Sequence, residues 1–157
     1  MIISRGFRYN RRMLPQVTIY SDGSCLGNPG RGGWAALIRS QDGEQVLTGG
    51  EEHSTNNRME LMAALRALHA LRQPSRVAFY TDSQYLRRGI TEWLPGWQAR
   101  GWKRKGGTLA NAELWQELSR AIQRHEIHWH WVKGHSINRD NQRVDRLARE
   151  AMLDQYR

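Results

Sequence analysis

The segment Val17-Thr18-Ile19-Tyr20-Ser21-Asp22 sets the pattern from which the fold of this 157-residue chain can be worked out. Its residues alternate between two faces, which is the period-two pattern of a β-strand. The alternation stops at Asp22, and a glycine-rich turn follows over residues 27–33. The segment therefore predicts a strand that carries a carboxylate near its C-terminal end.

Two further strands, over 34–40 and 46–50, are joined by the turn dipeptide Asp42-Gly43 and predict an antiparallel meander with the first. The later expected elements are a helix capped by Thr55 or Asn56 and ended by Pro74, a strand over 77–82, a helix over 83–93 closed by Pro95-Gly96, a loop over 101–107, a helix around 114–122, a strand over 127–132 and a helix around 144–151. Strands first and β-α-β alternation afterwards predict an α/β fold with a mixed sheet.

The composition indicates one globular domain with a polyanionic partner. Hydrophobic residues make up 39% of the chain, and 24 Lys and Arg against 15 Asp and Glu leave a net charge of +9. Such a charge favours nucleic acid, with an anionic membrane surface as the alternative. No apolar run approaches the roughly 20 residues of a spanning helix. Cys25 is the single cysteine, so disulfides and thiolate zinc sites are excluded, and we expect a cytoplasmic protein.

Residues 1–12 differ from the remainder of the chain. They carry four arginines, show no clear periodicity and contain no apolar core of a secretory signal. We expect a basic, disordered arm at 1–12 and a folded domain over 13–157. Met13 is also a possible natural start, which would make the arm an optional extension.

Four carboxylates have recognisable local contexts. Asp22 and Asp82 each end a strand, two residues after a tyrosine, and sites in open α/β sheets gather at the carboxyl ends of strands. Glu60 and Asp145 border the apolar faces of their helices and are expected to point toward the sheet. Four inward-facing acids repel one another unless a cation neutralises them, and Mg²⁺ prefers such oxygen ligands. The four acids together predict a metal site.

Each acid also has a simpler explanation when taken singly. Asp22-Gly23 is a common turn dipeptide, Asp82-Ser83 is suited to a helix N-cap, and Asp145 is suited to the first turns of a helix. The shared orientation of the four acids favours the metal site over these separate roles.

At these residues the chain resembles the type 1 ribonuclease H family, which includes bacterial ribonuclease HI. The similarity spans about residues 13–155, and the motifs come in the family's order and at its approximate spacing. The matching segments are 20–30 (YSDGSCLGNPG), 55–60 (TNNRME), 80–83 (YTDS), 131–135 (WVKGH) and 143–145 (RVD).

The resemblance implies a five-stranded mixed sheet, three strands antiparallel and two parallel, flanked by helices. It implies endonucleolytic hydrolysis of the RNA strand of RNA/DNA hybrids by a monomer, with 5′-phosphate and 3′-hydroxyl products. Asp22, Glu60, Asp82 and Asp145 are then the acids that hold two Mg²⁺ ions, which Mn²⁺ can replace. One ion can activate the attacking water while the other stabilises the leaving 3′ oxygen. His135 is implied as a mobile group that takes a proton from water or helps product release.

The resemblance also implies substrate contacts. Asn28, Asn56 and Gln84 match positions that touch the minor groove of the hybrid, and Ser83 lies near the scissile strand. Amide side chains both donate and accept hydrogen bonds, which suits 2′-hydroxyls and base edges. A basic protrusion with interleaved aromatic residues matches the family's handle, and its residues are Trp93, Trp97, Arg100, Trp102, Lys103, Arg104 and Lys105.

These contacts have alternatives too. Asn28 is suited to a turn and Asn56 to a helix cap, and the tryptophans could be core residues beneath a solvated basic loop, with Trp93 and Trp115 expected to be partly core. The chain departs from the family pattern over 136–139 (SINR), at Gln142 and at Ala110. Loop mobility, metal preference near Asp145 and hybrid affinity are therefore open.

Three rival functions fit parts of the pattern. Transposases, integrases and Holliday junction resolvases share an acid-lined sheet but cut DNA, and the 56–60 segment (NNRME) and the protrusion argue against them. The second rival is a domain of a reverse transcriptase. The complete protrusion and the start at Met13 favour a free-standing enzyme instead. A non-catalytic hybrid-binding module is the third, and its signature would be a lost acid, whereas all four are present.

Overall fold

The structure, a computed structural model, describes residues 14–104, 107–134 and 138–154. The expected arm over 1–12 lies outside the described residues, as do Lys105 and His135.

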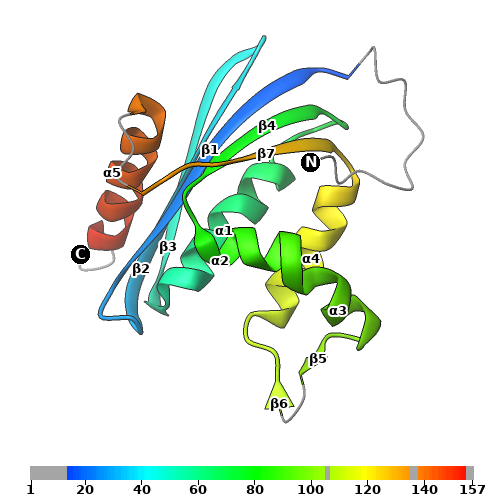
Figure 1. Cartoon of the computed structure of the whole chain (residues 1–157). Coiled ribbons are helices and arrows are strands. Elements are labelled where there is room, and N and C mark those ends of the chain that lie inside the picture. Colours follow the sequence, from blue (N-terminus) through cyan, green and yellow to red (C-terminus); the bar gives the residue numbers. More distant parts are fainter. Residues whose placement is uncertain (1–13, 105–106, 135–137, 155–157) are drawn as a thin grey trace.

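A five-stranded mixed sheet forms the centre of the molecule, with the strand order β3-β2-β1-β4-β7 (Figure 1). Its strands are β1 (Gln16–Leu26), β2 (Gly30–Ser40), β3 (Gly43–Ser54), β4 (Arg76–Thr81) and β7 (Glu126–Trp131). The first three form the antiparallel meander, while β4 pairs in parallel with β1 and β7 pairs in parallel with β4. The predicted α/β class and mixed sheet are confirmed.

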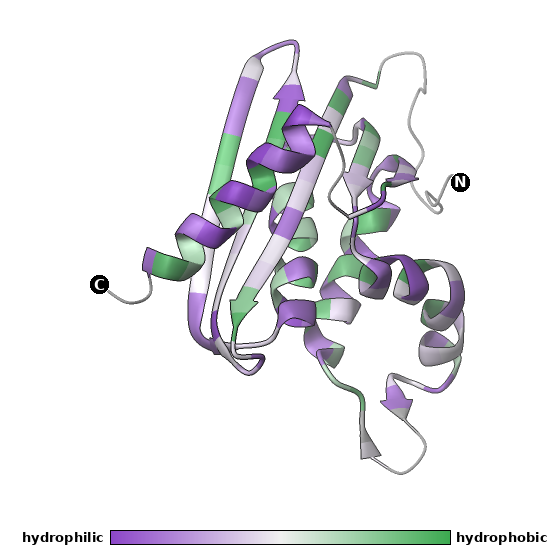
Figure 2. Cartoon of the chain, turned by 60° about the vertical axis from the view of Figure 1, so that its left-hand side comes forward, coloured by the Kyte–Doolittle hydropathy of each residue, from purple (hydrophilic) through white to green (hydrophobic). Residues whose placement is uncertain are grey.

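Helices cover both faces of the sheet unequally (Figure 1). One face carries α1 (Asn56–His69), α2 (Gln84–Arg88), the π-helical turn η2 (Gly89–Trp93), α3 (Leu94–Ala99) and α4 (Ala112–Gln123), whereas α5 (Arg139–Asp154) lies on the other. The larger core lies on the first side and includes Ile19, Phe79 and Trp115. Figure 2 shows hydrophilic and hydrophobic residues alternating along α5, as expected for a helix with one face on a sheet.

Three expected element boundaries differ from the structure. Pro95-Gly96 does not close the helix that begins at 84, because the chain stays helical to Ala99. Pro95 is the second residue of α3, directly after the π-helical turn, and helices tolerate proline in their first turn. Helix α1 ends at His69, before Pro74. The expected loop over 101–107 contains the short strands β5 (Lys103–Arg104) and β6 (Gly107–Thr108), which form a small hairpin away from the main sheet (Figure 1).

Candidate active site

Two of the four acids are brought together by the parallel pairing of β1 and β4. Tyr20 lies opposite Tyr80 in this pair, and their rings stack with centroids 4.7 Å apart. Asp22 and Asp82 each follow two residues later, so both carboxylates lie next to each other on the central strands of the sheet, where β4 ends. The register, set by the alternation of the two strands, confirms the predicted placement of this pair.

Glu60 reaches the two aspartates because α1 packs directly against the backbone of β1. A Cβ atom added at Gly23 would lie 2.4 Å from the Glu60 nitrogen and 2.5 Å from the Met59 carbonyl carbon. Only glycine permits such a close approach of strand and helix. The first turns of α1 therefore lie beside Asp22, and Glu60 joins Asp22 and Asp82. The expectation that Asp22 ends its strand is wrong, because β1 continues to Leu26 in its pairing with β2.

Asp22, Glu60 and Asp82 form a compact cluster. Each offers one carboxylate oxygen, and the three oxygens lie within 4.8 Å of one another. Asp145 lies close enough to Asp22 to hydrogen-bond with it when one of them is protonated. The Asp145 side chain is nevertheless 51% exposed, and its Oδ2 accepts a bond from Arg149 Nη2 at 2.9 Å. Three acids thus form the cluster, and the fourth stands at its rim.

Burial and mutual repulsion disfavour the charged forms of the clustered acids. Burial first, and then the charges of Asp82, Asp145 and Glu60, raise the pKa of Asp22 to about 9. Burial, with a smaller contribution from Asp82, raises the pKa of Glu60 to about 7. A divalent cation would relieve both effects, and an all-oxygen donor set is what a hard cation such as Mg²⁺ prefers. The residues present therefore fit a metal site.

Three predicted substrate contacts instead form a hydrogen-bond chain that ends on Glu60. The Ser83 hydroxyl donates to one Glu60 oxygen, and Asn56 Nδ2 donates to the other at 3.1 Å. The Asn28 Oδ1 accepts from the Asn56 backbone N–H at 2.9 Å. These bonds hold the Glu60 carboxylate toward the other two acids.

The capping alternatives are also resolved by these bonds. Thr55 caps α1 by accepting from the Arg58 N–H at 3.1 Å, so Asn56 is not the N-cap residue. Ser83 caps α2, accepting from the Leu86 N–H at 3.0 Å, so Asp82 is not a cap and remains available to the cluster.

The predicted aromatic contacts lie largely within the core. Trp97 is only 9% exposed, and its ring lies 5.5 Å from that of Trp93 and 5.2 Å from that of the buried Trp115. Trp93 and Trp102 are half-buried and pack against the same core. The predicted contacts that the structure shows as exposed are Asn28, Gln84, Arg100 and Lys103.

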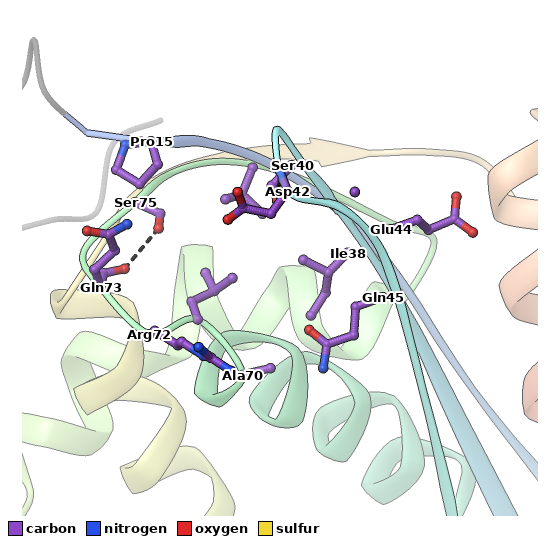
Figure 3. A pocket seen from close by; sticks show the side chains of 13 residues that line it. Pro15, Ile38, Ser40, Asp42, Glu44, Gln45, Ala70, Arg72, Gln73 and Ser75 are labelled. Atoms are coloured by element: carbon purple, nitrogen blue, oxygen red, sulfur yellow. Dashed lines mark hydrogen bonds between the residues drawn. The ribbon is translucent and has the colours of Figure 1, made fainter.

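A cavity of about 450 Å³ lies at the other end of the sheet (Figure 3). Its lining includes Pro15 at the start of β1, Ser40 at the end of β2 and Arg72 after α1. None of the four acids contributes to it.

Comparison with known proteins decides the family. The RNase H family model matches residues 15–153. The chain belongs to the ribonuclease H family. It is 57% identical over 143 residues to a ribonuclease H of Xanthomonas campestris pv. campestris (strain 8004), covering 90% of this chain and 95% of that one. Relatives of this identity bear the name ribonuclease H, so this ribonuclease H is an endonuclease of the hydrolase class, as its motifs predict.

Solved structures agree with this assignment. The crystal structure of LC9-RNase H1, a type 1 RNase H with the type 2 active-site motif, superposes with a TM-score of 0.82 and 36% identity, covering 90% of this chain and 74% of that one. LC11-RNase H1 in complex with RNA/DNA hybrid shares the fold, with a TM-score of 0.66 and 20% identity over 90% of this chain and 99% of that one. Among the described residues of this ribonuclease H, no helix is long and apolar enough to cross a membrane.

Two features of the site were not anticipated from the sequence. The pairing of Asp145 with Arg149 has a sequence signal, since opposite charges four residues apart in a helix are neighbours. The bond from Ser83 to Glu60 has none, because it joins residues 23 positions apart on two helices.

Proposed function

We propose that this ribonuclease H hydrolyses the RNA strand of RNA/DNA hybrids at the Asp22–Glu60–Asp82 cluster, with Asp145 as the fourth metal ligand. The observation that carries the proposal is the convergence of three largely buried carboxylate oxygens within 4.8 Å of one another. Burial and mutual repulsion disfavour the charged forms of these acids, and a bound divalent cation would let all three ionise together. The shared fold of a relative solved with a hybrid supports the substrate class.

Mg²⁺ is the proposed physiological metal, two ions with substrate bound, with Mn²⁺ as a working substitute. The chemistry that bound divalent ions supply at such a site is a more acidic water nucleophile and neutralised charge on the phosphate and leaving oxygen. The chain's own part is to keep the ligands aligned. Ser83 and Asn56 fix both oxygens of Glu60 through their hydrogen bonds. The proposed products carry 5′-phosphate and 3′-hydroxyl ends.

Other residues are proposed to bind the hybrid or move protons. Arg100 and Lys103 are exposed, and we propose that they contact phosphates. Arg104 and Lys105 are proposed to do the same, on the sequence pattern alone. The remaining proposed contacts are Asn28, Asn56 and Gln84 in the minor groove, Ser83 near the scissile strand, and Trp93 and Trp102 against sugars. The burial of Trp97 favours a role in supporting Trp93 over direct contact. His135 stays a proposed proton carrier outside the described residues.

The test is cleavage of an end-labelled RNA/DNA hybrid with Mg²⁺ beside an RNA duplex, a DNA duplex, a branched DNA and single strands. We expect cleavage of the hybrid's RNA strand alone, with 5′-phosphate ends and complete loss in EDTA. Cutting of branched DNA would assign the chain to the resolvase-like enzymes instead. Hybrid binding without cleavage would make it a binding module.

The monomeric state, the cytoplasmic location and the division into an arm over 1–12 and a domain over 13–157 stay predictions. Light scattering tests the first, and limited proteolysis with mass spectrometry tests the last. We expect proteases to remove the arm first and to leave a core that keeps hybrid-cleaving activity.

A further inference from the structure

Helix α5 carries Asp145 and packs on the sheet by one apolar face. Val144 and Ala148 contact Tyr20, Ala35 and Leu37, and Tyr80 and Leu147 pack around them. Across the described ranges no second helix covers this face of the sheet (Figure 2). Contacts at two further places add to this packing in fixing the position of α5 on the sheet.

The first such contact is an ion-pair network at the start of α5. Arg39 of β2 donates from Nη1 and Nη2 to the two oxygens of Asp140, at 3.1 and 3.0 Å. Glu44 of β3 accepts from Arg39 at 3.1 Å and from Arg143 at 2.6 Å. We name the four charged residues Arg39, Glu44, Asp140 and Arg143 the α5 clamp.

The second contact lies toward the other end of the helix. A Cβ atom added at Gly33 of β2 would lie 2.2 Å from the Met152 nitrogen and 2.4 Å from the Ala148 oxygen. The helix backbone therefore rests directly on the strand, and Ser24 Oγ lies 3.5 Å from Met152 Sδ as a donor. The helix is thus fixed at two places, and Asp145 lies on the segment between them.

A ligand on α5 can act together with Asp22 only if the helix keeps its position over the sheet, and Asp145 lies beside Asp22. Arg149 bonds to Asp145 but belongs to the same helix, so it cannot hold α5 against β2. Val144 and Ala148 pack on the sheet on either side of Asp145. The ion pairs that cross from helix to sheet near Asp145 are those of the clamp.

We propose that the α5 clamp is a positioning device that holds Asp145 beside the Asp22–Glu60–Asp82 cluster and so sets the metal requirement of the enzyme. The inference rests on the proposed role of Asp145 as a metal ligand. A single exposed ion pair contributes little to stability. The bidentate Arg39–Asp140 contact, however, has defined geometry and shares its arginine with Glu44. The clamp residues do not touch the cluster, so they act through the helix.

The experiment measures the Mg²⁺ concentration for half-maximal hybrid cleavage, the KM for the hybrid and the melting temperature. Arg39→Met should raise the half-maximal Mg²⁺ concentration about three to ten times, below the range of about 10–100-fold for groups bonded directly to a metal ligand. The hybrid KM should not change, and Arg39→Lys should recover part of the effect. Arg146→Gln is the matched control, because Arg146 pairs with Glu150 on the outside of the same helix.

Two further variants keep the proposal falsifiable. Glu44→Gln removes the negative charge that Arg39 and Arg143 share, with a smaller change, should Arg39→Met not fold. In an Asp145→Asn background, Arg39→Met should produce no further rise in the Mg²⁺ requirement, because the residue it positions is already changed.

The outcomes separate the two proposals. If Asp145→Asn raises the Mg²⁺ requirement and the clamp variants lower only the melting temperature, the clamp is merely structural and the inference is wrong. Additive effects of Arg39→Met and Asp145→Asn would overturn it as well. If Asp145→Asn leaves the requirement unchanged, the proposed role of Asp145 fails, and the clamp proposal fails with it.

Discussion

The Ser83 hydroxyl donates a hydrogen bond to the Glu60 carboxylate while it accepts one from the Leu86 backbone N–H at 3.0 Å. One side chain thus begins α2 and orients a candidate metal ligand on α1. The bond from Ser83 favours the charged form of Glu60 and opposes the effect of burial on its pKa. The start of a short helix and the charge state of the site are therefore linked.

Replacing Ser83 by alanine should affect stability and activity together. Loss of the cap should cost about 1 kcal/mol of unfolding free energy. Loss of the donor should move the pKa of Glu60 above its present value of about 7, so that half-maximal metal-dependent activity needs a higher pH. Urea unfolding and a pH–rate profile check both effects. Ser83→Thr, which keeps the hydroxyl, is the control, and an unshifted profile in Ser83→Ala would contradict the link.

Asp22 should destabilise the metal-free enzyme as the pH rises. Its pKa is raised from about 4 to about 9, so the folded state binds more protons than the unfolded state between these values. The stabilisation of the folded state by protonated Asp22 is complete below about pH 4 and is lost as the pH rises toward about 9. In EDTA at pH 7, Asp22→Asn should raise the unfolding free energy by at least about 1 kcal/mol. In Mg²⁺ the same substitution should abolish cleavage. A lower stability of Asp22→Asn in EDTA would show that the acids do not repel.

His125 should produce the opposite pH dependence on the acid side. It is fully buried, its Nδ1 accepts from the Ser75 N–H at 3.1 Å, and its Nε2 has no hydrogen-bond partner among the described residues. Burial, and less so Arg124, lowers its pKa to about 4. The stability it contributes is present above pH 6.5 and is lost as the pH falls toward 4, by up to about 3 kcal/mol.

The measurement for His125 is urea unfolding at pH 7 and pH 4.5 in the wild type and in His125→Asn. The asparagine Oδ1 can still accept from the Ser75 N–H, but the side chain does not titrate. The variant should lose less stability than the wild type between the two pH values. Equal losses in the two proteins would remove His125 as the cause.

The basic protrusion should govern the salt dependence of substrate binding. Neutralising Lys103, Arg104 and Lys105 together should raise the KM for the hybrid and lower the slope of log KM against log salt by about 1 per lost phosphate contact. Arg72→Gln is the control, since Arg72 lines the cavity at the far end of the sheet. An unchanged slope in the triple variant would leave the protrusion without a role in binding.

Local patterns predicted the strands and the acids well because these depend on short-range periodicity. The alternation before Asp22 and Asp82 fixes which residues face the same edge, and a helical stripe placed Glu60 on an inward face. The burial of Trp97 was not predicted as such, because Trp97 lies in α3, after the π-helical turn over Gly89–Trp93 that breaks the helical period. The Arg39–Asp140 contact joins residues 101 positions apart, so no local pattern reports it.

The most direct test of the central claim compares the wild type with Asp82→Asn in single-turnover cleavage and in binding of an end-labelled RNA/DNA hybrid with Mg²⁺. Asp82 has no part in capping α2, so its loss should spare the fold. We expect the variant to bind the hybrid as the wild type does and to cleave its RNA strand at least about 1,000-fold more slowly. Cleavage at near wild-type rate by Asp82→Asn, or by the wild type in EDTA, would contradict a metal centre built on these acids.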